Sequence, residues 1–510
     1  MFPGLTAAYW LTLHGIVTIG AVLLYIVTSH VLRQRRHPTA AIAWVLFILL
    51  VPYVALPAFW TFGSRKQARP RITALRITPP APGDPKGEGA WAVQTALALG
   101  QPAPAAFDDL RLHADGSAAL QALWATLNGA RHTLDICTFL IGRDALGAEL
   151  IERLVAKARA GVRVRLMIDG LGRIMAGSPS LHALAAAGAQ VTRFVPPLHS
   201  PLKGRTNLRD HRKMVIADAA HATARLWSGG RNLASEYFLG SADAPAWRDL
   251  SFDLRGAVVA QAHELFEHDW AFANGRRLEA PTDSQVGREG PGAPGAPGAQ
   301  DVPSRAAAVA VAVAVTAVVT DAVADAARSG VQPTGAQLVA SGPDQIDDTV
   351  YALLVTAAYR ARRRIAIVTP YFVPDAALLM ALGMAARRGV LVDLLVPARS
   401  NHPLSDIARR RALRTLADAG GRIWLAPTML HAKLVVVDDV LALAGSVNID
   451  SRSLFLNYEM MMAFHDAPVV ERFAQWFETE RAQAQRSVPK PPGLVGDVAD
   501  GLVLWLGFQL

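Results

Sequence analysis

The chain contains almost no cysteine: Cys137 is the single one among its 510 residues. One thiol excludes an intrachain disulfide and argues against a zinc site built from cysteines. The sequence also shows no clear cluster of metal-ligating side chains. We therefore expect a protein without a metal or another cofactor, whose chemistry depends on other residue types.

Charged residues are missing from two stretches near the amino terminus. Residues 1–32 contain no Asp, Glu, Lys or Arg, and residues 38–64 form a second uncharged stretch. Because about 20 apolar residues suffice to cross a bilayer as a helix, residues 1–64 are predicted to form a two-helix transmembrane hairpin. A cleaved signal peptide is the competing interpretation, but its apolar region would be shorter and would end before a second span.

The charge balance of the chain is basic. The net charge is +9, the sequence pI is about 9.9 and the mean hydropathy is +0.24. Such a balance favours an anionic partner, and composition alone leaves both nucleic acid and an acidic membrane surface open. Basic residues flank the uncharged stretches, with more of them after the second, which favours a cytoplasmic main body.

Two parts of the chain resemble each other in the same order. ARAGVRVRLMIDG at Ala158 matches ARRGVLVDLLVPA at Ala386, and HRKMVIAD at His211 matches HAKLVVVD at His431. The offsets are about 220 to 232 residues, far longer than the periods of solenoid repeats. The sequence therefore predicts a duplicated domain.

Within each copy, short β-branched runs follow alanine-rich stretches with helical spacing. Strands that alternate with helices predict α/β halves with mainly parallel, buried strands. The expected organisation after the hairpin is a connecting segment (65–107), a first half (108–274), a low-complexity linker (275–337), a second half (338–486) and an apolar carboxyl-terminal tail (487–510).

Each copy carries the pattern His-x-Lys-x-x-x-x-Asp and then a turn of small residues that ends in Asn. The residues are His211, Lys213, Asp218 and Asn232 in the first copy, and His431, Lys433, Asp438 and Asn448 in the second. His and Lys two positions apart on a strand point to one face, so both can meet one phosphate. A single copy would be typical of a solvated strand face, whereas two copies at matching places indicate a site.

These motifs resemble the phospholipase D superfamily, and the chain as a whole resembles bacterial cardiolipin synthases. WRDLSFDLRG, TPYFVPD and GSVNIDSRSLFLNYEM also carry the resemblance. It implies duplicated phospholipase D-like α/β/α halves, related by a pseudo-twofold axis, whose two motifs meet in one site. It further implies a phosphohistidine intermediate formed without a metal, with His211 as the nucleophile and His431 as the general acid and base.

The resemblance also implies roles for the side chains around the histidines. Lys213, Lys433, Asn232 and Asn448 would bind the phosphoryl group. Asp249 would orient His211, and Glu459 would orient His431. The motif carboxylates Asp218 and Asp438 are expected to be mainly structural, because buried carboxylates commonly serve hydrogen bonding.

The implied function is a cardiolipin synthase of the bacterial cytoplasmic membrane, multi-pass, with phosphatidylglycerol and anionic membrane lipid as partners. A phospholipase D-type hydrolase, or a transferase with another donor or acceptor, remains open, because water and alcohols enter the same chemistry. A nuclease is disfavoured by the uncharged stretches and by the lack of a basic run interleaved with aromatics. A non-catalytic scaffold is disfavoured because both His and Lys pairs are intact.

Overall fold

The computed structural model describes most of the two expected halves and the amino-terminal helices. The described residues are 3–31, 38–62, 89–177, 179–195, 208–241, 244–275, 335–345 and 347–489. The basic residues at 33–36 and 65–71, nearly all of the expected low-complexity linker and nearly all of the expected apolar tail lie outside these ranges.

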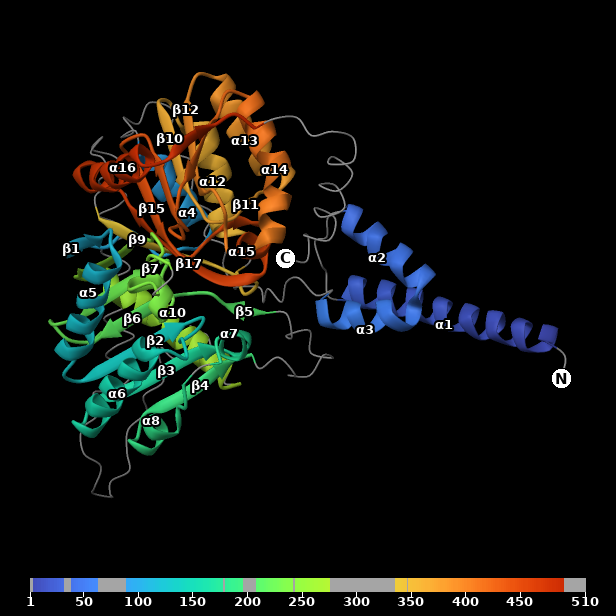
Figure 1. Ribbon diagram of the computed structural model, residues 1–510, viewed down its shortest axis with the longest axis horizontal. Helices are drawn as coiled ribbons and strands as arrows, with labels where there is room; N and C mark the ends of the chain where they lie inside the picture. The colour runs from blue at the N-terminus through green and yellow to red at the C-terminus, as the bar shows by residue number, and fades with distance from the viewer. Residues whose placement is uncertain are drawn as a thin grey trace, which may run out of the picture.

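Three helices precede the main body. They are α1 (Pro3–Val31), α2 (Pro38–Leu50) and α3 (Pro52–Phe62), and α1 contacts both of the others. The second uncharged stretch is divided because Pro52 has no N–H group and begins a new helix. Within the described ranges, no helix is both long enough and apolar enough to cross a membrane, so the expected pair of transmembrane spans is not supported. Figure 1 shows these helices beside the main body.

The first half is built around a seven-stranded sheet with the order β1-β8-β7-β6-β2-β3-β4. Its elements in chain order are β1 (Asp108–His113), α5 (Gly116–Gly129), β2 (Thr133–Thr138), α6 (Ala145–Arg159), β3 (Arg163–Asp169), α7 (Gly170–Met175), α8 (His182–Ala186), β4 (Gln190–Phe194), β5 (Arg209–Asp210), β6 (Met214–Ala217), β7 (Arg225–Gly229), α9 (Ser235–Phe238), β8 (Ser251–Arg255) and α10 (Val258–Ala273).

The second half is built around a sheet with the order β18-β13-β12-β10-β14-β15-β17, and β9 also pairs with β17. Its elements are β9 (Ala336–Ser341), α12 (Thr349–Arg360), β10 (Arg364–Val368), β11 (Phe372–Val373), α13 (Ala376–Arg387), β12 (Leu391–Pro397), α14 (Pro403–Asp418), β13 (Arg422–Ala426), β14 (Leu434–Val437), β15 (Leu441–Gly445), β16 (Ile449–Asp450), α15 (Ser451–Phe455), β17 (Asn457–Phe464), α16 (Ala467–Ala482) and β18 (Gln485–Ser487). α4 (Ala90–Ala98), from the expected connecting segment, packs on α12.

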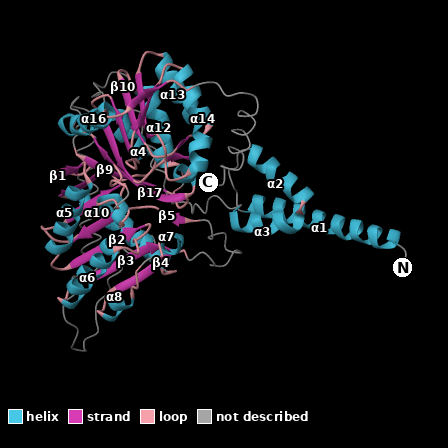
Figure 2. Ribbon diagram, in the orientation of Figure 1, coloured by secondary structure: helices cyan, strands magenta, loops and turns pink. Residues whose placement is uncertain are grey.

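The sheets are mixed, and the expectation of mainly parallel strands is wrong. In the first half, β2, β3 and β4 are parallel, whereas β6, β7, β8 and β1 join by antiparallel pairs. Short turns link β6 to β7 and β14 to β15, and such turns leave no room for the crossover helix that a parallel pair requires. Figure 2 shows the helices around both sheets.

Matching helices in the two halves begin in the same way. The side chain of Asp144 accepts a hydrogen bond from the Gly147 amide at the start of α6, at 2.9 Å. Asp375 does the same for Leu378 at the start of α13, at 3.0 Å. An aspartate at this position satisfies an amide that the first helical turn leaves open, so each helix is fixed by one residue of the repeat.

The two halves share a strand pair and a hydrophobic core. β5 of the first half lies parallel to β17 of the second, with Arg209 opposite Asn457 and Asp210 opposite Tyr458. One core cluster includes Phe266 from the first half together with residues of β17 and α16. The halves are therefore one packed unit, and the first motif follows the strand that crosses between them.

Candidate active site

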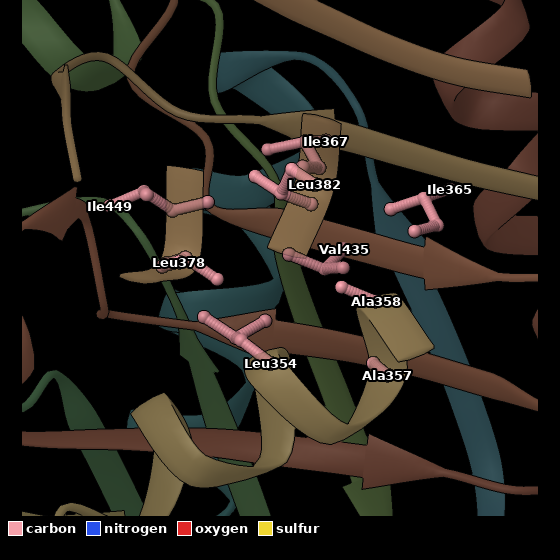
Figure 3. A pocket seen from close by; sticks show the side chains of 9 residues that line it. All are labelled: Leu354, Ala357, Ala358, Ile365, Ile367, Leu378, Leu382, Val435 and Ile449. Carbon is pink, nitrogen blue, oxygen red and sulfur yellow. The ribbon is translucent and has the colours of Figure 1, made fainter. Parts of the chain in front are cut away.

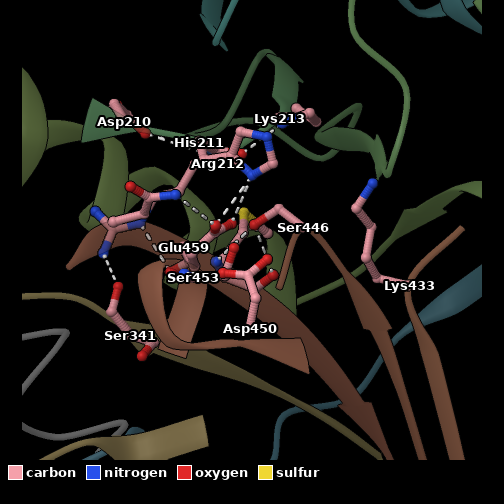
Figure 4. Close-up of polar contacts among 12 residues, drawn as sticks. Asp210, His211, Arg212, Lys213, Ser341, Lys433, Ser446, Asp450, Ser453 and Glu459 are labelled. Atoms are coloured by element: carbon pink, nitrogen blue, oxygen red, sulfur yellow. Dashed lines mark hydrogen bonds and ion pairs between the residues drawn. The ribbon is translucent and has the colours of Figure 1, made fainter. Parts of the chain in front are cut away.

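Each motif histidine is bound through its backbone to the opposite half. The amide of His211, directly after β5, donates to the carbonyl of Tyr458 at 2.9 Å. The amide of His431, between β13 and β14, donates to the carbonyl of Arg248 at 2.6 Å. The two motifs therefore lie along the interface between the halves, and side chains from both halves converge there in Figure 4.

The carboxylates pair with the histidines in the opposite way to that expected. Nδ1 of His211 lies 3.0 Å and 3.1 Å from the carboxylate oxygens of Glu459. Nδ1 of His431 lies 2.9 Å from Oδ2 of Asp249. The assignment of Asp249 to His211 and of Glu459 to His431 is therefore wrong, because each carboxylate stands at the interface and faces the histidine of the other half.

This pairing has a chemical consequence for the imidazole rings. A carboxylate at Nδ1 holds that nitrogen as the N–H donor and leaves Nε2 with its lone pair. Both carboxylates are completely buried, and both histidines have little exposed side chain. Each half thus supplies the orienting group for the other half's histidine, and neither half holds a complete pair by itself.

Aromatic rings that the sequence analysis did not single out enclose the histidines. The ring of Phe139 lies edge-on to His211, with centroids 5.3 Å apart. Tyr237 and Trp247 contact His431, with centroids 5.1 Å and 5.7 Å away. Trp247 belongs to a segment that carries the family resemblance, but its contact with the other half's histidine requires the folded chain.

The lysines of both motifs are buried beside the histidines. Nζ of Lys213 donates to the carbonyl of His211 at 2.7 Å, and Nζ of Lys433 lies 2.9 Å from Nε2 of His431. Burial lowers the pKa of Lys213 to about 8 and that of Lys433 to about 7. Burial, and then the charge of Lys433, lowers the pKa of His431 to about 3, and burial also lowers the pKa of His211. The site thus disfavours positive charge until an anion enters it.

The two asparagines are buried in the turns after β7 and β15. Nδ2 of Asn232 donates to the hydroxyl of Tyr237 at 2.8 Å. Within the described part of the chain, the Oδ1 atoms of Asn232 and Asn448 have no hydrogen-bond partner. A buried carboxamide that is not fully satisfied suits a polar ligand, and a flip of the group exchanges acceptor for donor. Phosphoryl binding by both residues stays a prediction.

The aspartates at the ends of the motifs hold backbone turns. Asp218 accepts hydrogen bonds from the amides of residues 131–133, at 2.7 to 3.1 Å. Asp438 accepts from the amides of residues 362–364, at 2.8 to 3.0 Å. Both have a positive φ, 51° and 49°, which fixes the turn after the motif strand. These contacts agree with a structural role, although the two residues were grouped with the catalytic motif.

Arg212 is a residue of the site that sequence reasoning missed. Its side chain is fully buried, and its Nε donates to the carbonyl of Glu459 at 3.0 Å. Nη2 donates to the carbonyl of Ser341 at 3.1 Å, and Nη1 forms an ion pair with Asp269. Figure 4 shows the arginine together with Glu459 and Ser341. The second motif has Ala432 at this position, so only the first motif is fastened to the opposite half in this way.

The described ranges contain no evident metal-binding site. They contain no group of three or more His, Cys, Asp or Glu residues that could hold an ion. A small cavity in the second half is enclosed by apolar side chains between α12, α13 and the sheet (Figure 3), among them Leu354, Ile365, Leu382 and Val435. None of the His, Lys, Asp or Asn side chains of the motifs lines this cavity, so it offers no group for phosphate chemistry.

Comparison with known proteins gives two family matches. A family model described as cardiolipin synthase, phospholipase D-like domain, matches residues 123–270 and 354–481, together more than half of the chain. A second model, described as phospholipase D-nuclease N-terminal, matches residues 21–64. The first match covers parts of both halves, in agreement with the duplication seen in the sequence.

Curated relatives are similar over most of the chain. Cardiolipin synthase A of Pseudomonas entomophila is 29% identical over 478 residues, which are 90% of this chain and 90% of that protein. Cardiolipin synthase 1 of Bacillus cereus is 26% identical over 467 residues, 88% of this chain and 84% of that protein. The crystal structure of phosphatidylserine synthase from Haemophilus influenzae Rd KW20 has a TM-score of 0.55 and 13% identity, and covers 82% of this chain and 100% of that one. This likeness confirms the duplicated α/β fold.

Proposed function

Because the chain belongs to the family of cardiolipin synthases with phospholipase D-like domains, and is thus a phosphatidyltransferase, we propose that it joins two phosphatidylglycerol molecules into cardiolipin and releases glycerol. The observation that carries the proposal is the pair of crossed contacts, His211 with Glu459 and His431 with Asp249. A two-step transfer at phosphorus needs one nucleophile and one proton donor, and the interface supplies one oriented imidazole for each task.

In the first step of the proposed reaction, Nε2 of His211 attacks the phosphorus of one phosphatidylglycerol. The bond from phosphorus to the glycerol oxygen breaks, and His431 gives a proton to that oxygen. Free glycerol leaves, and the phosphatidyl group remains on His211. Glu459 stabilises the charge that develops on the His211 ring, as a carboxylate at Nδ1 does in other histidine mechanisms.

In the second step, the terminal hydroxyl of another phosphatidylglycerol takes the place of the glycerol. His431 now removes the hydroxyl proton, the oxygen attacks phosphorus, and the bond to His211 breaks. Cardiolipin leaves, and both histidines return to their first state. Lys213 and Lys433 offset the negative charge of the phosphoryl oxygens, which is largest in the transition state.

The protonation of His431 follows from the binding of substrate. In the empty site its pKa is about 3, with burial as the main cause and Lys433 as the second. A bound phosphodiester is an anion, and a nearby negative charge raises the pKa of an imidazole. Substrate binding therefore favours the acid form of His431 at the moment when the leaving oxygen needs a proton.

We further propose that residues 3–62 attach the enzyme to the bacterial cytoplasmic membrane, with the catalytic body in the cytoplasm. α1 and α2 expose many large apolar side chains, among them Trp10, Ile16 and Leu50. Exposed apolar surface of this extent is typical of an interaction with lipid or protein. A basic chain suits an anionic membrane surface as well as an anionic lipid substrate.

The test is lipid analysis after expression in a bacterial host that makes no cardiolipin. The proposal predicts cardiolipin and one glycerol for each molecule formed, and no product with the His431→Ala variant. Phosphatidic acid in place of cardiolipin would identify a hydrolase and overturn the proposal. Cardiolipin formed only after another donor or acceptor lipid is added would change the assigned substrate.

A further inference from the structure

The short helix α7 presents apolar side chains to the solvent at its carboxyl end. Ile174 is 64% exposed and Met175 is 61% exposed, although the helix is part of a packed α/β body. The exposed surface of two adjacent large apolar side chains has a lower free energy in an apolar medium than in water. The exposed end of α7 therefore calls for an apolar partner.

The opposite side of α7 forms part of the wall of the active site. A Cβ atom on Gly172 would lie 2.0 Å from the carbonyl oxygen of Phe139, so only glycine permits this close approach. The ring of Phe139 in turn contacts His211, with centroids 5.3 Å apart. A single layer of protein thus separates the exposed end of α7 from the nucleophile.

A buried carboxylate ties α7 to the strand that leads to His211. Oδ1 of Asp169 accepts hydrogen bonds from the amides of Leu171 and Gly172, at 2.8 Å and 3.0 Å. Oδ2 of the same residue accepts from the amide of Asp210, next to His211, at 2.9 Å. In Figure 1, α7 lies near β5 on the side of the body toward α1, α2 and α3. The helix and the catalytic strand are therefore fixed to each other.

Basic side chains accompany the apolar ones. Arg173 lies between Gly172 and Ile174, and Arg193 on β4 is close enough that burial and then the charge of Arg193 lower the pKa of Arg173. Two neighbouring guanidinium groups favour an anionic partner. Apolar side chains flanked by arginines are typical of a segment that lies in the interface of an anionic bilayer.

We propose that α7 inserts into the surface of an anionic bilayer at the mouth of the active site. Ile174 and Met175 enter the lipid, while Arg173 and Arg193 bind phosphates of the headgroups. This inference rests on the proposed function, because the bilayer that α7 enters supplies the lipid substrate. Contact beside the wall of the site shortens the path of a headgroup from the membrane to His211.

The first test compares activity on two forms of phosphatidylglycerol with the full chain. One variant carries Ile174→Asp and Met175→Asp, and the matched control carries Met380→Asp and Met384→Asp on α13, where the methionines are 59% and 45% exposed. With phosphatidylglycerol vesicles, kcat/KM of the α7 variant should fall about tenfold or more, because two apolar contacts with lipid are lost. With a short-chain phosphatidylglycerol below its micelle concentration, kcat/KM should stay within about twofold, since the site itself is intact.

The possible outcomes distinguish a failure of this inference from a failure of the proposed function. A wild-type protein without activity on either substrate would overturn the proposed function. A variant that keeps its activity on vesicles would overturn the inference and leave the function standing. Equal losses on both substrates would also overturn the inference, because α7 would then only support the site. A control variant with the same selective loss on vesicles would also overturn the inference, because any pair of introduced surface charges would then lower activity on vesicles.

A second test locates α7 relative to the lipid. The single native cysteine, Cys137, is buried, so a fluorescent probe attached after Met175→Cys reacts at one place. In proteoliposomes that contain brominated lipid, the proposal predicts strong quenching of this probe and little quenching of a probe attached after Met384→Cys. No quenching at position 175, or equal quenching at both positions, would overturn the inference.

Discussion

The ion pair between Arg212 and Asp269 makes a strong prediction about stability. Both side chains have no exposed surface, so each charge depends on the other. The substitution Arg212→Met keeps much of the apolar stem but removes the buried partner of the Asp269 carboxylate, which keeps only the contact of 3.5 Å with Nδ1 of the partly exposed His268 among its ion pairs in the described ranges. Breaking a buried pair from one side costs about 3–5 kcal/mol. The loss of the donations to the carbonyls of Glu459 and Ser341 adds to this cost.

The assay is equilibrium unfolding of the full chain in urea, with a matched control on the surface. Arg363 pairs with Asp439, but these side chains are 59% and 46% exposed. Arg363→Met should therefore change the free energy of unfolding by about 1 kcal/mol or less. The double variant Arg212→Met, Asp269→Leu should recover part of the loss, because it removes both buried charges.

Two comparisons test whether burial makes the Arg212–Asp269 pair strong. If Arg212→Met and Arg363→Met lower the free energy of unfolding by the same small amount, burial does not set the strength of the pair. If the double variant is as unstable as Arg212→Met, the loss comes from the arginine's other contacts. Either result would refute the claim that the buried ion pair with Asp269 is the main source of the loss, and the second would assign the loss to the contacts with Glu459 and Ser341 in the second half.

Four further predictions concern the site. Asp249→Asn should lower kcat about 10²- to 10⁴-fold in initial-rate assays, because an amide cannot stabilise the imidazolium of His431; an unchanged kcat would contradict the crossed pairing. Asp218→Ala should lower the free energy of unfolding by about 1–3 kcal/mol in urea but leave kcat per folded molecule within about twofold, because its carboxylate accepts from backbone amides and from the Thr223 hydroxyl and contacts neither histidine of the motifs. The pKa of Lys433 is about 7 in the folded chain, against an ordinary value of 10.5, so between pH 7 and pH 10 the unfolded chain holds more protons than the folded chain and stability rises with pH. Wild type should therefore gain stability over Lys433→Met across this range, which unfolding curves at both pH values check. A chelator should leave activity unchanged, and activity restored only by a stoichiometric metal would contradict this.

The motifs could be predicted from the sequence because their geometry is local. His and Lys two positions apart share a strand face whatever the rest of the chain does. The repeat then indicated that two such faces exist. The carboxylates that contact the histidines were harder to predict. The contacts of His211 with Glu459 and of His431 with Asp249 depend on how the two halves pack against each other. That is a property of the interface, and spacing along the chain does not encode it.

Arg212 escaped the sequence analysis for a related reason. Comparison of the repeats draws attention to positions that recur, and Arg212 has Ala432 as its counterpart. Its role comes from contacts with Glu459 and Ser341, which are more than 120 positions away along the chain. The mixed sheets and the break at Pro52 were missed because apolar runs give the type of an element more readily than its direction or its end.

The central claim is that the two motifs form one site in which both histidines act on the same phosphorus. The most direct measurement is the turnover of His211→Ala, His431→Ala and the double variant, with the full chain in phosphatidylglycerol vesicles. Residues that act as a unit are strongly non-additive, so each single variant should lose about 10³-fold or more and the double variant should be little worse. Substantial cardiolipin formation by either single variant, or a double variant whose loss is the product of the two, would contradict the shared site.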